Sequence, residues 1–246
     1  MTEHFGRAAN DFFITAPSSC PYLPGRLERK VFTILQGRNA DRANDVLTHR
    51  GFRRSQNIIY RPACDGCSSC VAVRVPANEF DPSRSQRKIL ARNKDIQREV
   101  KPAIGTKEQF SLLRSYLDVR HQEGGMAEMT VLDFMSMVEE TSVDTMLIEY
   151  RERAGGELLA CALTDRLNDG LSMVYSFFSP FHERRSLGSM MILDHIDFCC
   201  EDGRDYVYLG YWVAGSPKMA YKSRFRPMER LSRGGWEPLF HGEAKT

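Results

Sequence analysis

The hydrophobic pattern of the second half of the chain changes from a helical period to a strand period and back. Apolar residues recur at helical spacing in 106–122 and in 131–140, and each segment is predicted as an amphipathic helix. Runs with strand character follow, and the short turns between them predict an antiparallel meander. These predicted strands occupy 145–152, 157–167 and 171–180. A long helix over 184–203 and an aromatic-rich strand over 206–213 complete the order.

Two helices, three strands, a helix and a strand is the element order of the GNAT acyltransferase fold, which is built around a split sheet. We therefore expect an α+β fold, GNAT-like, with a mixed and mainly antiparallel sheet. The first half reads as short strands, at 31–35 and 71–75, joined by loops rich in Pro and Arg, with a helix over 40–51.

Pro and Gly in KPAIGTK mark a predicted boundary near Lys101. We expect two parts: residues 1–101, a basic lobe with a cysteine cluster, and residues 102–246, the GNAT-like catalytic lobe.

Charge separates the same two parts. Residues 1–101 hold 18 Lys and Arg against 10 Asp and Glu, whereas residues 102–246 hold 16 against 22. A basic lobe suits a polyanionic partner, although a solvated basic face is the simpler alternative. A helix is predicted over 83–101, with seven basic and two acidic residues. Its exposed side is expected to contact phosphate, mainly through Arg84, Arg87, Lys88 and Arg92.

Composition excludes several classes of protein. No apolar run approaches the roughly 18–20 residues of a membrane span, and the N-terminal stretch has no apolar core of a secretory signal. Seven cysteines without such a signal predict reduced thiols and a cytoplasmic protein with no membrane partner. No GxxxxGK[ST] motif is present, so no ATP site is expected.

Three of the cysteines lie three residues apart, in RPACDGCSSC. Cys64, Cys67 and Cys70, with Cys20 as a fourth ligand, supply the thiolates for a zinc ion or an iron–sulfur cluster. The alternative is that all four are ordinary buried thiols. Cys161, Cys199 and Cys200 are expected in the core.

Long blocks of the sequence resemble the aminoacyl-tRNA–protein transferases. CPYLPGRLERKVFT, GFRRS, YRPACDGCSSC and VRVPANEFDPSRSQRK resemble their N-terminal region. VYSFFSPFHERRSLGSMMIL, YLGYWVAGSPKMAYKSRF and RGGW resemble their C-terminal region. The chain length and the form of the cysteine block are those of the short bacterial branch, which transfers leucine.

The resemblance implies an activity and a metal. Such an enzyme moves an amino acid from charged tRNA to the α-amine of a protein with an N-terminal Asp or Glu. The product is a destabilising N-terminus read in N-degron proteolysis. In the family the cysteine group is associated with a metal or an iron–sulfur cluster, which maps here to Cys20, Cys64, Cys67 and Cys70.

The chemistry is the aminolysis of an ester, which runs downhill and needs mainly positioning and stabilisation of an oxyanion. The acceptor carboxylate requires cations, and a tyrosine on or after a cleft strand is a candidate for moving the proton. The candidates for binding the acceptor are Arg53, Arg54, Arg74, Lys222 and Arg224. The candidates for catalysis are Tyr175, Tyr211 and Tyr221.

The turn RRSLGS opens the long helix, where GNAT enzymes bind the pyrophosphate of acetyl-CoA. We expect Arg184, Arg185 and Gly188 to hold the 3′ end of the tRNA there instead, with no CoA. Three alternatives stay open. They are arginyl rather than leucyl transfer, an acetyl-CoA-dependent N-acetyltransferase, and a non-catalytic zinc-containing module that binds nucleic acid.

Overall fold

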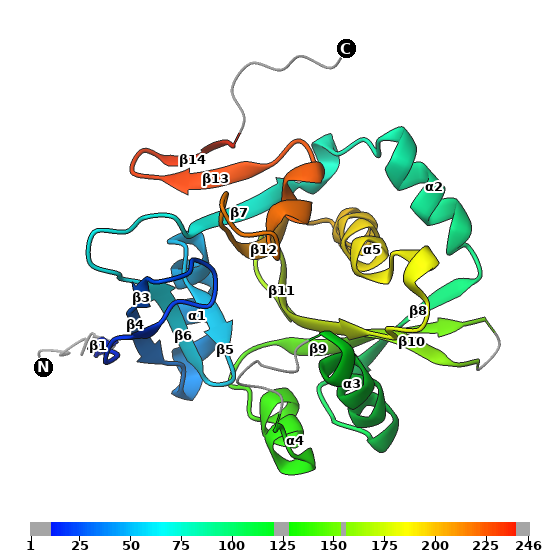
Figure 1. Ribbon diagram of the computed structural model, residues 1–246, viewed down its shortest axis with the longest axis horizontal. Helices are drawn as coiled ribbons and strands as arrows, with labels where there is room; N and C mark the ends of the chain where they lie inside the picture. The colour runs from blue at the N-terminus through cyan, green and yellow to red at the C-terminus, as the bar shows by residue number, and fades with distance from the viewer. Residues whose placement is uncertain (1–10, 121–127, 154–155, 240–246) are drawn as a thin grey trace, which may run out of the picture.

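An eight-stranded sheet forms the centre of the computed structural model, which describes residues 11–120, 128–153 and 156–239 (Figure 1). Its strand order is β14-β13-β7-β12-β11-β10-β9-β8. Every neighbouring pair is antiparallel except β11 and β12, which are parallel. The strands are β7 (Val71–Pro76), β8 (Ile96–Pro102), β9 (Thr145–Glu152), β10 (Leu158–Arg166), β11 (Gly170–Phe178), β12 (Tyr206–Trp212), β13 (Glu229–Ser232) and β14 (Gly235–Pro238).

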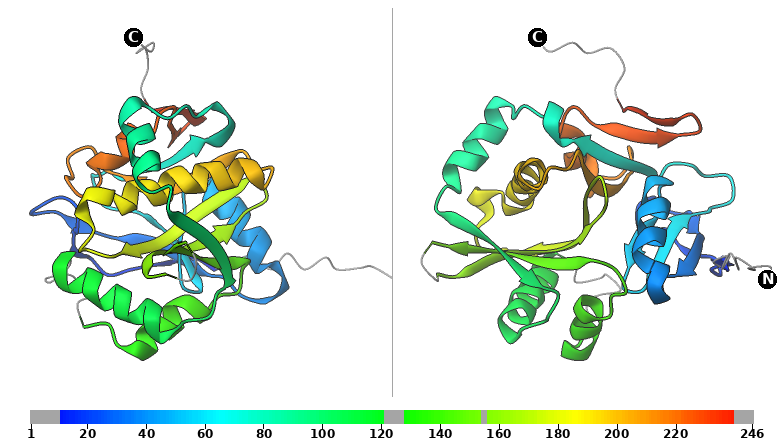
Figure 2. Two further views of the ribbon diagram at one scale, coloured as in Figure 1. Left: turned by 90° about the vertical axis from the view of Figure 1, so that its right-hand side faces the viewer. Right: turned by 180° about the vertical axis from the view of Figure 1, so that it is seen from behind.

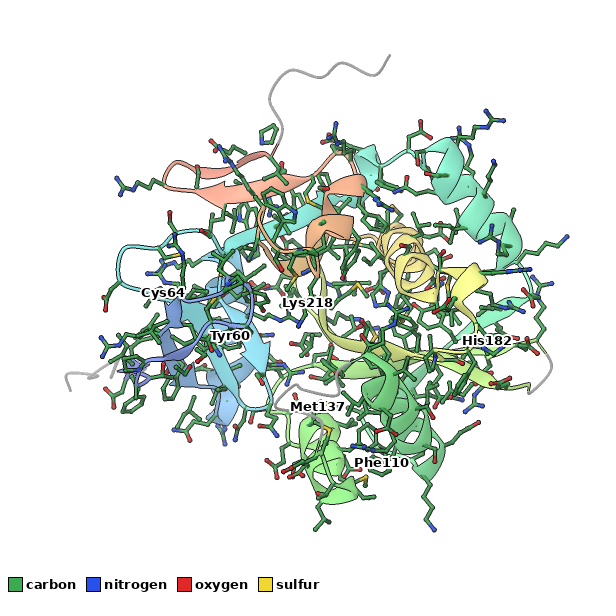
Figure 3. All side chains as sticks on the ribbon, in the orientation of Figure 1. Tyr60, Cys64, Phe110, Met137, His182 and Lys218 are labelled. Atoms are coloured by element: carbon green, nitrogen blue, oxygen red, sulfur yellow. The ribbon has the colours of Figure 1, made fainter. Side chains whose placement is uncertain are left out.

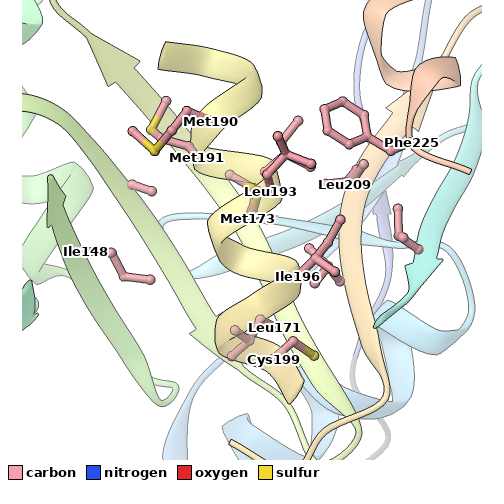
Figure 4. Close-up of a cluster of buried hydrophobic side chains, with 14 of the residues drawn as sticks. Ile148, Leu171, Met173, Met190, Met191, Leu193, Ile196, Cys199, Leu209 and Phe225 are labelled. Atoms are coloured by element: carbon pink, nitrogen blue, oxygen red, sulfur yellow. The ribbon is translucent and has the colours of Figure 1, made fainter. Parts of the chain in front are cut away.

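Helices cover both faces of this sheet (Figure 2). Helices α2 (Arg84–Arg92) and α5 (Leu187–Glu201) lie on one face, and α3 (Lys107–Arg120) and α4 (Val131–Glu139) lie on the other. Because strand side chains alternate between faces, neighbouring residues such as Leu147 and Ile148 belong to different cores. The core around α5 joins Met191 and Ile196 to residues of β9, β11 and β12 (Figure 4).

A second, four-stranded sheet lies beside the first, in the order β1-β4-β6-β5. Helix α1 (Ala40–His49) packs on it around the buried Leu35, Leu47 and Ile59. Its strands are β1 (Phe13–Ile14), β4 (Lys30–Ile34), β5 (Arg53–Ser55) and β6 (Ile58–Pro62). A short pair, β2 (Ser18–Ser19) and β3 (Leu27–Glu28), lies between β1 and β4 in the chain. The 3-10 turns are η1 (Gly37–Asn39), η2 (Ala77–Glu79), η3 (Glu183–Arg185) and η4 (Ala220–Arg224).

The predicted α+β class, with a mixed and mainly antiparallel sheet, is confirmed, and so is the meander, as β9, β10 and β11. The predicted helix over 106–122 corresponds to α3, and its last two residues lie outside the described part of the chain, as does the N-terminal stretch 1–10. No helix in the described ranges is both long and apolar enough to span a bilayer.

The single helix predicted over 83–101 is wrong. The chain forms α2 to Arg92, turns at Asn93, and pairs with β9 as β8. Asn93 ends the helix because its side chain donates to the carbonyls of Ile89 and Arg185. The last basic residues of the segment therefore lie on a sheet edge.

The predicted start of the long helix is also wrong by three residues. Residues 183–185 form η3, and Ser186 has a φ of 53°, a left-handed conformation that separates η3 from α5. The boundary at Lys101 stays a prediction, although β7 and β8, which begin before it, belong to the large sheet.

Candidate active site in the split sheet

The parallel strands β11 and β12 run together for only a short distance. Their pairing extends from Gly170 opposite Tyr206 to Ser172 opposite Tyr208, and a bulge in β12 lies between Tyr208 and Gly210. Beyond this point the strands part, so peptide groups of both strands lose the partners that a continuous sheet would give them. Buried peptide groups without a partner are costly.

Two cations satisfy peptide carbonyls where the strands part. Arg53, on β5, donates from Nη2 to the carbonyl of Val174 in β11. Lys222, on η4, donates from Nζ to the carbonyls of Leu209 and Tyr211 in β12, each at 2.7 Å. Burial, and secondarily the charge of Arg53, lowers the pKa of Lys222 to about 7. Both side chains were predicted to bind the acceptor, and in the structure each donates to backbone carbonyls.

A cleft of about 980 Å³ opens between the parted strands. Its walls come from β11, the first turns of α5, the C-terminal part of α3, the loop after β12, and β5 and β6 of the second sheet. Figure 3 labels four lining residues, Tyr60, Met137, His182 and Lys218, which come from four separate segments of the chain. Its buried apolar lining includes Met173, Ile192 and Leu209, which also belong to the core around α5.

A serine–histidine pair lies in this cleft that the sequence analysis missed. Ser179 Oγ and His182 Nδ1 are 2.9 Å apart, just after the end of β11. Ser179 is buried and His182 is half-buried. A serine and a histidine three residues apart, between a strand and a helix, was the available signal. Such a pair can pass a proton to or from a bound reactant.

The N-terminus of α5 faces the same cleft, where Ser186, Leu187, Gly188 and Ser189 all line it. The first N–H groups of a helix have no partner within the helix, and they favour an anion or a developing oxyanion. A Cβ on Gly188 would lie 3.1 Å from the ring of Phe178, so glycine allows close packing here.

The predicted role of Arg185 in binding tRNA is not available in this geometry. Its guanidinium makes two bonds to Asp95, at 3.0 and 2.8 Å, and one to Glu152 at 3.1 Å. Arg184 is exposed, and its carbonyl accepts a bond from Arg92. This contact places the end of α2 beside the entry to α5.

The basic residues predicted to contact phosphate, from the segment 83–101, are exposed along one short helix. Arg84, Arg87, Lys88 and Arg92 all lie on α2, whose buried contact is made by Gln86. Together with Arg184 they form a basic ridge next to the entry of α5, which we name the α2 ridge. Its place beside the cleft suits a long polyanion that extends out of the site.

The other predicted acceptor cations are also occupied or lie elsewhere. Arg54 forms a buried two-pronged pair with Asp165, with both distances 2.6 Å. Arg74 bonds Glu229 at 2.7 Å and lies 3.5 Å from the ring centroid of Tyr206. Arg224 is exposed and is not part of the cleft lining described.

Of the three predicted catalytic tyrosines, Tyr175 and Tyr221 line the cleft. Burial raises the pKa of each, so both hydroxyls stay protonated at neutral pH and can donate a hydrogen bond. Tyr211 instead donates to the carbonyls of Gly51 and Tyr60, at 2.8 and 3.0 Å, and so joins the two sheets.

The four cysteines predicted to bind a metal lie near one another without forming a closed set. Burial raises the pKa of Cys70 to about 11, and Cys20, Cys64 and Cys67 each add to the shift. No three of these four sulfurs, all in the described part of the chain, lie within 4.8 Å of one another.

A separate polar cluster joins α1 to the large sheet. His49 Nε2 lies 2.8 Å from Asp169 Oδ2, and Tyr208 donates to the same oxygen at 2.9 Å. Asp45 accepts from the backbone N–H and the side chain of Asn168, both at 2.9 Å. The ligand atoms of Asp45, His49 and Asp169 lie within 4.8 Å of one another, and their bonds to Asn168 and Tyr208 fix α1 to the large sheet.

The comparisons with known proteins identify the family of this chain. The chain matches the family model described as arginine-tRNA-protein transferase, N terminus, over residues 18–88, and the model of its C terminus over residues 108–232. It is 61% identical over 245 residues to the aspartate/glutamate leucyltransferase of Rhodopseudomonas palustris strain BisA53, covering 96% of this chain and 95% of the relative. It is 60% identical over 244 residues to that of Bradyrhizobium sp. strain BTAi1, covering 96% and 94%.

Among solved structures, the chain is similar to a GCN5-related glucosamine N-acetyltransferase region of a fungal multi-domain β-N-acetylglucosaminidase. The TM-score is 0.42 at 10% identity, over 90% of this chain and 24% of the other.

The α+β fold, with a parted parallel pair and a helix that starts beside it, is GNAT-like. Within that class, the chain belongs to the arginine-tRNA-protein transferase family, so it is an aminoacyltransferase. The resemblance found in the sequence is confirmed, and neither the acetyltransferase nor the non-catalytic alternative is favoured.

Proposed function

We propose that the enzyme transfers leucine from charged tRNA to the α-amine of proteins with an N-terminal Asp or Glu, in the cytoplasm, and so supplies N-degron proteolysis. The observation that carries the choice of leucine is the composition of the cleft. In the described lining the single carboxylate is Glu183, which is exposed, whereas Met173, Ile192 and Leu209 are buried and apolar.

This lining favours a leucyl over an arginyl group. A guanidinium taken out of water needs an acidic partner, and a buried cation without one is costly. A leucyl side chain gains from the same apolar surface by about 1.5–3 kcal/mol when fully buried. The names of the relatives, which are leucyltransferases at about 60% identity, support the same donor.

The reaction needs no enzyme-bound acyl group. The neutral α-amine attacks the ester carbonyl, the N–C bond forms, the bond to the ribose 3′ oxygen breaks, and one proton moves from nitrogen to that oxygen. The N–H groups at the start of α5 are suited to the oxyanion, and Tyr175 and Tyr221 can donate hydrogen bonds. His182, held by Ser179, is suited to pass the proton from the amine to the 3′ oxygen.

The tRNA itself is expected to lie along the α2 ridge. Arg84, Arg87, Lys88 and Arg184 are exposed there beside the entry of α5. Contacts of this kind supply affinity and little base identity. The identity of the donor then comes from the cleft and not from the ridge.

We also propose that Cys20, Cys64, Cys67 and Cys70 hold a zinc ion or an iron–sulfur cluster. The other three thiols each raise the pKa of Cys70, because thiolates repel one another. A cation bound by all four would offset this repulsion and favour their deprotonated form. The loop has to move for this, because no three of the four sulfurs lie within 4.8 Å of one another. Such a group would stiffen the loop next to β6.

A donor competition tests the function. The enzyme is incubated with an Asp-peptide and with leucyl-tRNA, arginyl-tRNA or acetyl-CoA, and the peptide mass is measured. The expected product carries one leucyl residue from leucyl-tRNA, with at most a small fraction of that rate from the other donors. Faster transfer from arginyl-tRNA, or acetylation, would refute the proposal.

A further inference from the structure

Most of the cations that the sequence offered for the acceptor's acidic side chain already have partners within the protein. Arg53 and Lys222 satisfy strand carbonyls, and Arg54 and Arg74 are paired with carboxylates. Arg224 lies outside the cleft lining described. A carboxylate that enters the cleft needs a cationic partner, because burying it unpaired is costly, and cations without an internal partner are the better candidates.

Two further cations line the cleft, Arg120 at the end of α3 and Lys218 in the loop between β12 and η4. Both are exposed, and neither forms an ion pair within the described part of the chain. The guanidinium of Arg120 lies over the ring of Phe178, 5.4 Å from its centroid. Stacking of this kind fixes the plane of the guanidinium and leaves its N–H edges for a ligand.

These two cations belong to the lining of the same cleft, one on α3 and one in the loop after β12. Tyr116 lies one helical turn before Arg120, and Tyr221 follows Lys218 by three residues. Tyr116 and Tyr221 line the same cleft, so α3 and η4 both contribute to its wall. Figure 3 shows Lys218 near the middle of the molecule, on the segment that leads from β12.

We propose that Arg120 and Lys218 bind the side-chain carboxylate of the acceptor's N-terminal Asp or Glu. This inference rests on the proposed function and names the residues that give it acidic specificity. A stacked guanidinium offers a carboxylate two parallel N–H donors. The flexible ammonium of Lys218 can follow the carboxylate when the side chain is longer by one methylene, which allows both Asp and Glu.

A peptide with an N-terminal Asn provides the test, because Asn has the shape of Asp without its charge. The measurement is the ratio of kcat/KM for leucyl transfer to an Asp-peptide and to the matched Asn-peptide. It is made for wild type, Arg120→Gln, Lys218→Met and the double variant. Each single change is expected to lower the ratio by about 10-fold, and the double variant to bring it near one, since a bond to a charged group contributes roughly 1.5–3 kcal/mol.

Matched controls are Arg38→Gln and Lys94→Met, which remove an exposed positive charge outside the cleft lining described. They should leave the ratio unchanged. Binding of the same two peptides, measured by calorimetry without tRNA, separates specificity from transfer. A preference for the Asp-peptide that the double variant loses supports the inference even if leucine is not the donor.

Two results would overturn the inference. The first is an unchanged Asp-to-Asn ratio in the double variant, provided that it melts like wild type. The second is an unchanged ratio with a raised KM for leucyl-tRNA and a shallower salt dependence, which would assign the two cations to phosphate.

Discussion

A Cβ atom on Gly210 would lie 2.4 Å from Nη1 of Arg53, so the guanidinium occupies the space of a side chain at the bulge of β12. Gly210 has a φ of +70°, which favours glycine as well. Glycine therefore meets two requirements at position 210. The backbone is left-handed there, and Arg53, which donates to the carbonyl of Val174, passes over it. The parting of β11 and β12 depends on both.

Replacing Gly210 by alanine is expected to destabilise the enzyme and to slow transfer. The left-handed φ costs roughly 1–3 kcal/mol for a residue with a side chain, and the displacement of Arg53 adds to it. Gly25→Ala is the matched control, since Gly25 has a φ of +71° and open space around it. We expect a larger fall in Tm for Gly210→Ala and at least about a tenfold loss of rate that Gly25→Ala does not share. Equal losses in the two variants would show that the packing against Arg53 is unimportant.

The bond between His49 and Asp169 makes the docking of α1 depend on pH. This bond raises the pKa of His49 above its ordinary value. The folded state then holds the proton more tightly than the unfolded state. The stabilisation is complete below the unfolded pKa of about 6.5 and is lost as the pH rises through the folded pKa.

The unfolding free energy of wild type should therefore exceed that of His49→Gln most at low pH, and the gap should narrow above about pH 6.5. Asp169→Asn should remove the same dependence. Denaturant titrations at several pH values measure it, and curves that run parallel for wild type and both variants would contradict the role of this pair.

Lys222 makes the unfolding free energy depend on pH with a sign opposite to that of His49. Its pKa is lowered from 10.5 to about 7, so between these values the unfolded chain binds more protons than the folded one. The stability of wild type then rises with pH relative to Lys222→Met, by at most about 1.4 kcal/mol per pH unit. Denaturant titrations from pH 7 to pH 9 check this. A gap between the two proteins that stays constant or shrinks would show that Lys222 is charged throughout.

The α2 ridge is expected to supply salt-dependent affinity for tRNA. Alanine at Arg84, Arg87 and Lys88 should weaken binding and reduce the slope of log K against log salt by about one for each phosphate that is no longer neutralised. The control removes three exposed charges elsewhere, at Arg38, Arg42 and Lys107. The measurement is the affinity for tRNA at several salt concentrations, for wild type, the ridge variant and the control. Identical slopes in the ridge variant and wild type would place the tRNA on another surface.

The sequence predicted the parts of this enzyme that local patterns encode. The meander, α3 and α5 follow from periodicity, and the family follows from long blocks of residues. The sequence predicts one helix over 83–101, because Ile96 and Val100 fit a helical period as well as a strand period. In the structure the second part of this segment is a strand, because it pairs with β9. Local sequence does not contain that partner.

Most of the site could not be read from the sequence, for a similar reason. Whether Arg54 is free depends on Asp165, which is 111 residues away in the chain. The role of Lys222 depends on carbonyls exposed by the parting of two strands. Ser179 and His182, in contrast, are three residues apart, and a search for short serine–histidine spacings would have found them.

The most direct test of the account is leucyl transfer by an enzyme whose cleft is filled. Ser176, on β11, lines the cleft, and Ser111, on α3, is exposed outside its described lining. We predict that Ser176→Trp lowers the rate of transfer from leucyl-tRNA to an Asp-peptide by about 100-fold or more, while Ser111→Trp transfers at the wild-type rate. Ser189→Trp provides a second block at the start of α5 if Ser176→Trp does not fold. A folded, cleft-filled variant that transfers leucine at the wild-type rate would contradict the claim that the reaction takes place between β11 and β12.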